Sequence, residues 1–593
     1  MTEAPPPDSA PAEGKVLRDA AETLRTPALQ PAHVSPTQQK QIGLLKRAMK
    51  CVDRDPNQAL ELAQKAVAID PGFSKAQHVV GLLLHRSGQL SKALEHYEQA
   101  WKADPADVDI YQNLGLVAWR LTMLEAAEKF FRLGMSNEPH RNDVLINLTG
   151  VLRDMGRFDD AIELLRQAIY AHPGEHKLWN MLGSVLVEAG DPTQAEVFYR
   201  EAITIKPDFG RAWHNLANSL DIVGRTDEAL EAFDNALASQ LDAPQDRGQI
   251  CHAQALCLLS AGRLKEGWEV YDIRTQPIYE NSTIFLIPKP RWDRDPASLA
   301  GRRVLVIGEQ GLGDEVLFAN ALQDVIDAVG PDGKVLVGVE HRLVSMFKRA
   351  YPDAIVGPHA TFGAEGRKCR GVGWLEKEGD ADIWMPMGDA CCVFRPTLDS
   401  FPAEPGFLPA DPDRVAEMRA QLDALGPGLK AGIIWKSLLM TPNRAKFFSP
   451  FQQWAPVLRT PGVHFVNLQY GDVDEELAQA DREYGVTIHQ IDGLDVKNDL
   501  EGVAALGAAL DLSMGPMTAS TNLAAAAGGE YWVLGYQNQF TFHATDRMPW
   551  YPTARIFCPP AWGKWDPAMK KLAIALAERA EASNDGKQAE AAA

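Results

Sequence analysis

The sequence predicts an α-helical solenoid followed by an α/β half that contains two parallel sheets. Two observations lead to this fold class. From about residue 40 to residue 272, one pattern of small, bulky and proline residues returns every 34 positions. Beyond about residue 300, short runs of Val, Ile and Leu alternate with amphipathic stretches. Continuous apolar runs between helical segments are typical of parallel strands that are buried on both faces.

The repeat is built from small residues, a bulky residue and a proline. An alanine is followed four positions later by a bulky residue and seven positions later by a second small residue. Small residues let two helices approach closely, the bulky side chain fills the gap beside them, and the proline ends the second helix. The alanines are Ala93, Ala127, Ala161, Ala195 and Ala229, and the prolines are Pro71, Pro105, Pro139, Pro173 and Pro207.

This pattern resembles the tetratricopeptide repeat, with Trp179, Leu182 and Gly183 at the signature positions of a first helix. We count five clear units, a weaker one at 40–73 and a degenerate last one at 248–272. The resemblance implies a solenoid whose concave groove binds extended partners.

Asn113, Asn147 and Asn215 occupy the same position in their units, while the unit between the last two has Met181 there. A row of carboxamides on a concave face can hold a peptide backbone, because each carries two donors and an acceptor. The row resembles the asparagine ladder of O-linked N-acetylglucosamine transferases, which implies acceptor-peptide binding. In the alternative interpretation, asparagine at this position caps or packs against the neighbouring unit.

In the second half, the expected strands are 303–308, 334–340, 430–436, 464–471, 509–515 and 530–535, and the helical stretches include 315–329, 412–425 and 565–580. Parallel sheets bind ligands in the loops at the carboxyl ends of their strands. The loop after the first strand has the sequence GEQGLGD, residues 308–314, which fits neither a dinucleotide fingerprint nor a P-loop. Glu340, at the end of the second strand, leaves a dehydrogenase as a minor alternative.

Within this first loop, Gly311 and Gly313 would let the backbone approach a ligand closely. Asp314 opens the following helix, where it could act as a general base or only cap the helix.

The second sheet supplies candidates for binding the phosphate of a donor. Lys436 ends a strand, and Arg444 and Lys446 follow on the loop. Their charge would face a leaving phosphate, unless they are simply a solvated basic loop. Hydroxyls and amides at the start of a later helix make an anion site. The hydroxyl residues there are Thr518, Ser520 and Thr521.

Five segments, GEQGLGDEVLFA, IIWKS, FVNLQYGD, NLAAAAGG and MPWYP, resemble the heptosyltransferase-like half of bacterial tetratricopeptide-repeat glycosyltransferases. The resemblance implies a GT-B fold of two Rossmann-like lobes, with the donor bound mainly by the second lobe and Asp314 as general base. It also implies that no metal is needed, although D-x-D triplets begin at Asp293, Asp411 and Asp472. Met517 and Asn522 depart from the Asp and His that these relatives commonly carry.

From these features we expect six segments: a disordered tail at 1–35, the repeat array at 36–275, a linker at 276–300, the first lobe at 301–405, the second lobe at 406–580 and a disordered tail at 581–593.

Composition and charge narrow the class of protein. The 593 residues carry 59 Lys and Arg against 79 Asp and Glu, a formal net charge of −20. Because nucleic-acid surfaces need clustered basic residues, we expect no nucleic-acid partner. The seven cysteines show no C-x-x-C pair or zinc spacing, so we expect a reduced compartment and no structural metal. The sequence shows neither a secretory signal nor an apolar run long enough to span a membrane, so we expect a cytoplasmic protein without membrane insertion.

The expected function is protein O-glycosylation without a cofactor. The repeat array would bind a polypeptide, and the GT-B half would transfer a sugar to its Ser or Thr hydroxyls. Resemblance to flagellin-modifying transferases favours flagellin as acceptor and a CMP-activated nonulosonic acid, such as pseudaminic acid, as donor. Two alternatives are a transferase of N-acetylglucosamine from a UDP-sugar and a non-catalytic repeat adaptor or chaperone. The oligomeric state is left open.

Overall fold

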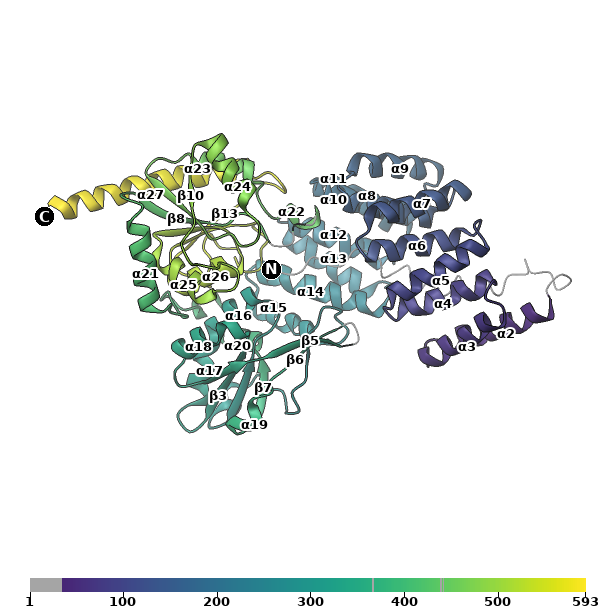
Figure 1. Cartoon of the computed structure of the whole chain (residues 1–593), viewed down its shortest axis with the longest axis horizontal. Coiled ribbons are helices and arrows are strands. Elements are labelled where there is room, and N and C mark those ends of the chain that lie inside the picture. Colours follow the sequence, from purple (N-terminus) through teal and green to yellow (C-terminus); the bar gives the residue numbers. More distant parts are fainter. Residues whose placement is uncertain (1–34, 365–366, 438–439, 441, 593) are drawn as a thin grey trace. The chain divides into compact units, whose positions relative to one another are not determined.

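The computed structural model of the protein describes residues 35–364, 367–437, 440 and 442–592 (Figure 1). The described residues divide into two compact units. One comprises residues 35–219 and 234–246, and the other comprises residues 220–233 and 247–592. The tail expected at 1–35 lies outside the described residues except for Ser35, which caps the first helix described.

Seven helix pairs form the repeat region of the described chain, as the 34-residue spacing predicts. The helices are α2 (Pro36–Cys51), α3 (Pro56–Ile69), α4 (Ser74–Arg86), α5 (Leu90–Ala103), α6 (Val108–Arg120), α7 (Leu124–Asn137), α8 (Asn142–Asp154), α9 (Phe158–Ala171), α10 (His176–Glu188), α11 (Pro192–Ile205), α12 (Gly210–Ile222), α13 (Thr226–Ala238), α14 (Pro244–Ser260) and α15 (Leu264–Tyr271). The helical solenoid predicted from the repeat is confirmed.

Close contacts between paired helices explain the small residues of the repeat. All five repeat alanines are fully buried. A Cβ atom at Gly183 would lie 2.6 Å from the ring of Tyr199 on the next helix. A side chain larger than hydrogen at this position would therefore push the two helices apart.

The repeat-closing prolines have a second role that the sequence pattern did not reveal. The side chain six residues after the proline, on the next helix, donates a hydrogen bond to the proline carbonyl in four units. The bonds run from Gln77 to Pro71 (2.8 Å), Tyr111 to Pro105 (3.0 Å), Trp179 to Pro173 (2.8 Å) and Trp213 to Pro207 (2.9 Å). Leu145 occupies this position after Pro139 and cannot donate. The signature tryptophans thus fix the turn between units as well as filling space.

The first parallel sheet has the order β4-β3-β2-β7. Its strands are β2 (Arg303–Ile307), β3 (Lys334–Val339), β4 (Ile355–Pro358) and β7 (Ile383–Pro386). The second has the order β10-β9-β8-β11-β12-β13, with β8 (Leu429–Ile433), β9 (Val463–Asn467), β10 (Ile488–His489), β11 (Leu512–Pro516), β12 (Tyr531–Leu534) and β13 (Ala554–Phe557). The six expected strands all form. In chain order the second sheet reads 3-2-1-4-5-6, the doubly wound arrangement of Rossmann folds.

Residues 276–300 are more than the expected linker. They contribute β1 (Ile284–Phe285), which pairs with β6 (Arg367–Gly371) in a small sheet of order β1-β6-β5 whose third strand is β5 (Ala360–Ala364). Trp292 is buried and its backbone N–H donates to the carbonyl of Trp384 at 2.7 Å. This segment is therefore packed onto the first sheet.

The helices of this half are α16 (Leu312–Phe318), α17 (Leu322–Val329), α18 (Val344–Ala350), α19 (Leu375–Glu378), α20 (Met387–Phe394), α21 (Pro412–Asp423), α22 (Pro442–Ala445), α23 (Ala455–Leu458), α24 (Asp474–Gln479), α25 (Leu500–Ala509), α26 (Ala519–Ala526) and α27 (Asp566–Ala592). Short 3-10 turns include η1 (Asp272–Thr275), η2 (Pro296–Leu299) and η3 (Ala319–Ala321), and η3 interrupts the helix expected at 315–329. The disordered tail expected from residue 581 is helical through Ala592, because its Ala, Glu and Lys residues favour helix.

The last repeat pair, α14 and α15, shares one apolar core with both sheets. Trp268 and Leu259 belong to the same buried cluster as Val304 of β2 and Trp550 of the second lobe. His543 ties this junction: its Nδ1 donates to the carbonyl of Leu259 and its Nε2 accepts from the indole N–H of Trp550, both at 2.9 Å. Burial lowers the pKa of His543 to about 4, so the ring is neutral, as both bonds require.

Candidate active site

The expected site loops lie where ligands bind in doubly wound sheets. Strand β2 lies between β3 and β7, and β8 lies between β9 and β11. From each of these strands the chain continues to the neighbour on one side and later returns to the neighbour on the other side. Doubly wound sheets bind their ligands at such a switch point, beyond the carboxyl ends of the strands. The loop 308–311 follows β2, Lys436 follows β8, and Thr518 follows β11.

The first loop and the helix after β11 meet. Asn522 on α26 donates from Nδ2 to the carbonyl of Gly313 at 3.0 Å. A Cβ atom at Gly313 would lie 3.3 Å from that nitrogen, so the glycine permits the approach. Within the described residues, the Oδ1 of Asn522 and the hydroxyl of Tyr551 are buried without a hydrogen-bond partner. An unpaired buried polar group costs free energy, so a ligand that reached these atoms would restore a hydrogen bond.

Asp314 is half-buried in the first turn of α16 and caps that helix. Its Oδ2 accepts the N–H of Gly311 at 3.0 Å. Burial raises the pKa of Tyr271 and of Tyr551 well above their usual range, and the nearby carboxylate of Asp314 adds to both shifts. Both buried phenols are therefore protonated near this carboxylate. Capping is thus shown, and the role of general base stays a prediction.

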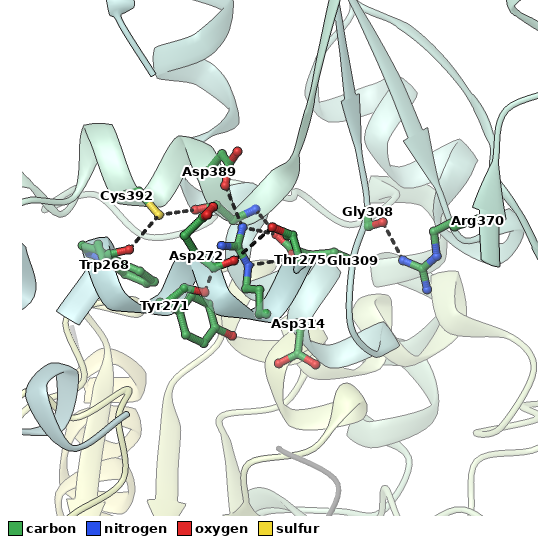
Figure 2. A network of polar contacts seen from close by, with 12 residues as sticks. Trp268, Tyr271, Asp272, Thr275, Gly308, Glu309, Asp314, Arg370, Asp389 and Cys392 are labelled. Atoms are coloured by element: carbon green, nitrogen blue, oxygen red, sulfur yellow. Dashed lines mark hydrogen bonds and ion pairs between the residues drawn. The ribbon is translucent and has the colours of Figure 1, made fainter. Parts of the chain in front are cut away.

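A buried ion network holds Glu309, the residue after Gly308 (Figure 2). Arg274, which is 0% exposed, binds Glu309 through Nε at 2.8 Å and through Nη2 at 2.9 Å. The same Nη2 lies 2.9 Å from Oδ1 of Asp389 on α20, and Arg291 and Arg294 also bind Asp389. The network joins the end of the last repeat to the loop after β2 and to α20.

The charges of this network balance. Burial opposes the ionisation of Asp389, but the guanidinium groups of Arg274, Arg291 and Arg294 hold its pKa below the usual value. Asp272 binds Arg291 at 2.8 Å and also pairs with Arg294. Sequence reasoning missed these partners, because they are separated by up to 115 positions and no local motif connects them.

The hydroxyl residues expected to bind the donor are buried and mostly engaged locally. Thr518 caps α26: its N–H donates to the hydroxyl of Thr521 at 2.8 Å, and its own hydroxyl accepts the N–H of Thr521 at 3.4 Å. The Thr521 hydroxyl also donates to the Pro516 carbonyl at 3.0 Å, and Ser520 is 2% exposed. Met517 lies in the apolar core, where the hydroxyl of Thr541 contacts its sulfur at 3.7 Å. These contacts rigidify the loop that leads into α26.

The three basic candidates have different surroundings. The ammonium of Lys436 pairs with Glu476 and donates to the Asp472 carbonyl at 3.0 Å, so its charge is already balanced. Arg444 is half-buried and donates to the hydroxyl of Ser437, the residue after Lys436, at 3.3 Å. Lys446 lies over the ring of Trp562, 5.5 Å from its centroid. Each of the three basic side chains therefore has its own partner, and their binding of a donor phosphate stays a prediction.

The asparagines of the repeat region do not form a uniform row. Asn113 is 1% exposed, donates to the Asp109 carbonyl at 2.7 Å and lies 2.8 Å from Nε2 of His78. Asn215 donates to Oδ1 of Asn180 at 3.0 Å, and Asn147 is half-buried. His78 and Asn180 each belong to the preceding unit. Packing against that unit, the alternative interpretation, thus describes Asn113 and Asn215, and peptide binding stays a prediction.

The D-x-D triplets serve as turns and caps. Asp293 accepts the hydroxyl of Ser298 at 2.8 Å, Asp411 caps α21, and Asp472 accepts the N–H of Asp474 at 3.3 Å. Across the described part of the chain, no three His, Cys, Asp or Glu residues converge as a metal site would require.

The fold and the site define a tetratricopeptide-repeat protein with an α/β half made of parallel sheets. A family model of the TPR repeat matches residues 81–121, and two models of the tetratricopeptide repeat match residues 151–208 and 181–271. In the described residues, no helix combines the length and apolar character needed to cross a bilayer.

Among characterised proteins, the chain is similar to Protein FlbA of Caulobacter vibrioides, with 44% identity over 354 residues. The match covers 60% of this chain and 59% of that protein. Solved structures similar to the repeat region include YrrB, a TPR protein with an unusual peptide-binding site (20% identity, 33% of this chain, 98% of that chain, TM-score 0.25). They also include a thermophilic TPR protein of Thermus thermophilus (22% identity, 31% of this chain, 99% of that chain, TM-score 0.28). At such scores these superpositions add nothing to the repeat assignment.

Proposed function

We propose that the protein is an O-glycosyltransferase that binds a polypeptide through its repeat array and glycosylates Ser or Thr hydroxyls in the α/β half. The observation that carries the proposal is the meeting of two switch-point loops. Asp314 and Gly313 from the first sheet lie against α26 of the second, joined by the Asn522 to Gly313 bond of 3.0 Å. Two parallel sheets that face each other through such loops fit a two-lobed GT-B enzyme.

In the proposed reaction, Asp314 takes the proton of the acceptor hydroxyl as its oxygen attacks the anomeric carbon. A bond forms between that oxygen and the carbon. The bond from the carbon to the donor phosphate breaks, and the nucleotide leaves with the electron pair. Asp314 is half-buried and not enclosed, so an acceptor hydroxyl could approach it.

The donor phosphate would be held by Arg444 together with the N-terminal amides of α26, an eight-residue helix. Lys436 could contribute only if its pair with Glu476 opened. The unpaired oxygen of Asn522 can accept a hydrogen bond, and the hydroxyl of Tyr551 can accept or donate one, as a hydroxyl-rich sugar would require. Because both residues are buried, at 3% and 1% exposure, the sugar would reach them only if the surrounding side chains moved.

The finer assignment rests on resemblance. Flagellin as acceptor and a CMP-activated nonulosonic acid such as pseudaminic acid as donor are favoured by the similarity to flagellin-modifying transferases, and the 44% identity to Protein FlbA is compatible with that acceptor. A UDP-dependent N-acetylglucosamine transferase is the alternative within the same class. Tetratricopeptide repeats, matched in three segments, support a protein partner in either case.

The test is co-expression with flagellin in a host that makes the activated sugar, followed by intact-mass measurement of flagellin. A mass gain equal to a nonulosonic acid supports the favoured donor, and a gain equal to N-acetylhexosamine supports the alternative. Asp314→Asn should abolish the gain, whereas the matched control Asp327→Asn, on the exposed side of α17, should keep it. Transfer at the normal rate by Asp314→Asn would show that the base lies elsewhere.

A second candidate function is a non-catalytic adaptor. The observation that favours it concerns Met517 and Asn522, which replace the Asp and His of the relatives. Met517 lies in an apolar core and Asn522 bonds to Gly313, so both side chains have a role in packing. Stable binding of flagellin without a mass gain, in the presence of each activated sugar, would decide for the adaptor.

A further inference from the structure

The side of the first loop opposite Glu309 is held by Arg370 of β6. This arginine is 4% exposed. Its Nη1 donates to the Gly308 carbonyl at 2.5 Å, and its Nη2 donates to the Gln310 carbonyl at 3.2 Å. Figure 2 shows the guanidinium directed at Gly308. One side chain thus binds the two carbonyls that flank Glu309 in the sequence.

Glu315 on α16 fixes the arginine in turn. Its Oε1 accepts from Nη1 of Arg370 at 3.1 Å and lies 2.8 Å from Nε2 of His359. Its Oε2 accepts the N–H of Glu340 at 2.8 Å. A Cβ atom at Gly308 would lie 2.4 Å from the carboxyl carbon of Glu315, so a larger residue at position 308 would displace this carboxylate.

The peptide group between Gln310 and Gly311 links Arg370 to Asp314. Its carbonyl, from Gln310, accepts from Arg370, and its N–H, from Gly311, donates to Asp314 at 3.0 Å. Gln310 also has φ of 57°, a left-handed conformation that costs a residue other than glycine about 1–2 kcal/mol. Lys368 also donates to this carbonyl, from Nζ at the longer distance of 3.4 Å. The surrounding contacts must therefore hold this peptide, and rotating it would break the hydrogen bonds on both of its sides together.

We propose that Arg370 is the positioning residue of the candidate active site: by fixing the Gln310–Gly311 peptide, it sets where the carboxylate of Asp314 lies. The inference rests on the proposed function of Asp314 as base. A lysine would keep the charge, but its single ammonium lacks the planar fork that reaches two carbonyls. Arg370 is buried and its guanidinium is bonded to protein groups, so we assign it no contact with the substrate.

The experiment compares Arg370→Lys with Arg303→Lys in the full chain. Arg303 is the matched control, since it also donates to two backbone carbonyls, those of Asp380 at 2.8 Å and Glu378 at 2.6 Å, on a different loop. Arg370→Lys should lower kcat on the order of 10²-fold and change the donor KM by less than about threefold, because geometry and not donor binding is lost. Added guanidinium should restore part of the activity of Arg370→Ala, which a purely structural loss would not allow.

Hydrogen exchange keeps the inference testable without any sugar donor. The amide of Gly311 should exchange faster in Arg370→Lys than in the parent chain, and at the parental rate in Arg303→Lys. If the parent chain transfers no sugar yet Gly311 shows this change, the proposed function fails, while the finding that Arg370 fixes the Gln310–Gly311 peptide stands. Unchanged exchange at Gly311 in Arg370→Lys, or an unchanged kcat, would overturn the inference.

Discussion

Replacing Arg274 with methionine should destabilise the α/β half by about 3–5 kcal/mol, the cost of leaving buried carboxylates without their partner. Methionine keeps much of the volume but none of the charge. We expect a loss in the free energy of unfolding at the high end of this range. Arg274 is 0% exposed and binds Glu309 twice, at 2.8 and 2.9 Å, as well as Asp389. Arg291 and Arg294 would still face Asp389, so Asp389 loses one of its three arginine partners and Glu309 loses both of its bonds to Arg274.

The assay is urea unfolding at several pH values, with hydrogen exchange of residues 303–311 as a local probe. The pKa of Asp389 is lower in the folded chain than its usual value, so its ion pairs stabilise the fold above that value and lose their effect as the pH falls through the folded pKa. The gap between variant and parent should therefore narrow at acid pH. The control Arg482→Ala removes an exposed pair with Glu475 and should leave the unfolding curve unchanged. A change of under about 1 kcal/mol for Arg274→Met at neutral pH would refute the account of the network.

Three further predictions follow from the packing. Trp179→Phe keeps an aromatic ring but removes the hydrogen bond to the repeat-closing proline, so urea unfolding should show a loss of about 1 kcal/mol. A fragment of residues 276–593 should aggregate while one of residues 247–593 folds, as judged by size-exclusion chromatography, because the former exposes the core that α14 and α15 cover. Asn113→Ala should lower the melting temperature, because Asn113 is buried and hydrogen-bonded. Asn147→Ala should weaken acceptor binding, measured by calorimetry, and leave the melting temperature unchanged. A lower melting temperature for Asn147→Ala, with weaker acceptor binding for Asn113→Ala, would contradict the assignment.

Local pattern was enough to predict the repeat helices and six of the ten strands in the two larger sheets of the described chain. Period and apolar runs are properties of neighbouring residues, so the alanine spacing and the run at 303–308 could be interpreted without tertiary knowledge. Strands β1 and β10, each two residues long, could not be predicted, since nothing so short has a period. The packing of the segment expected to be a linker could not be predicted for another reason. Trp292 is buried, its ring stacks on Phe394 and its backbone N–H donates to Trp384, and both partners are distant in sequence.

The site divides in the same way. Placing Asp314 and Thr518 at the ends of strands needed only the order of strands and loops along the chain. Whether a side chain is available depends on what surrounds it in space. The pairing of Lys436 with Glu476 and the burial of Asn113 therefore altered expectations that the sequence alone supported equally well.

By itself, the sequence determined a helical repeat array, a parallel α/β half and the loops where chemistry would occur, because periodicity and strand order are written along the chain. Only the tertiary structure decided that α14 and α15 share the core of the α/β half, and that Arg274 and Arg370 hold the first loop from two sides. Buried ion pairs of this kind depend on distance and exclusion of water, and residues far apart in sequence acquire both only when the chain folds.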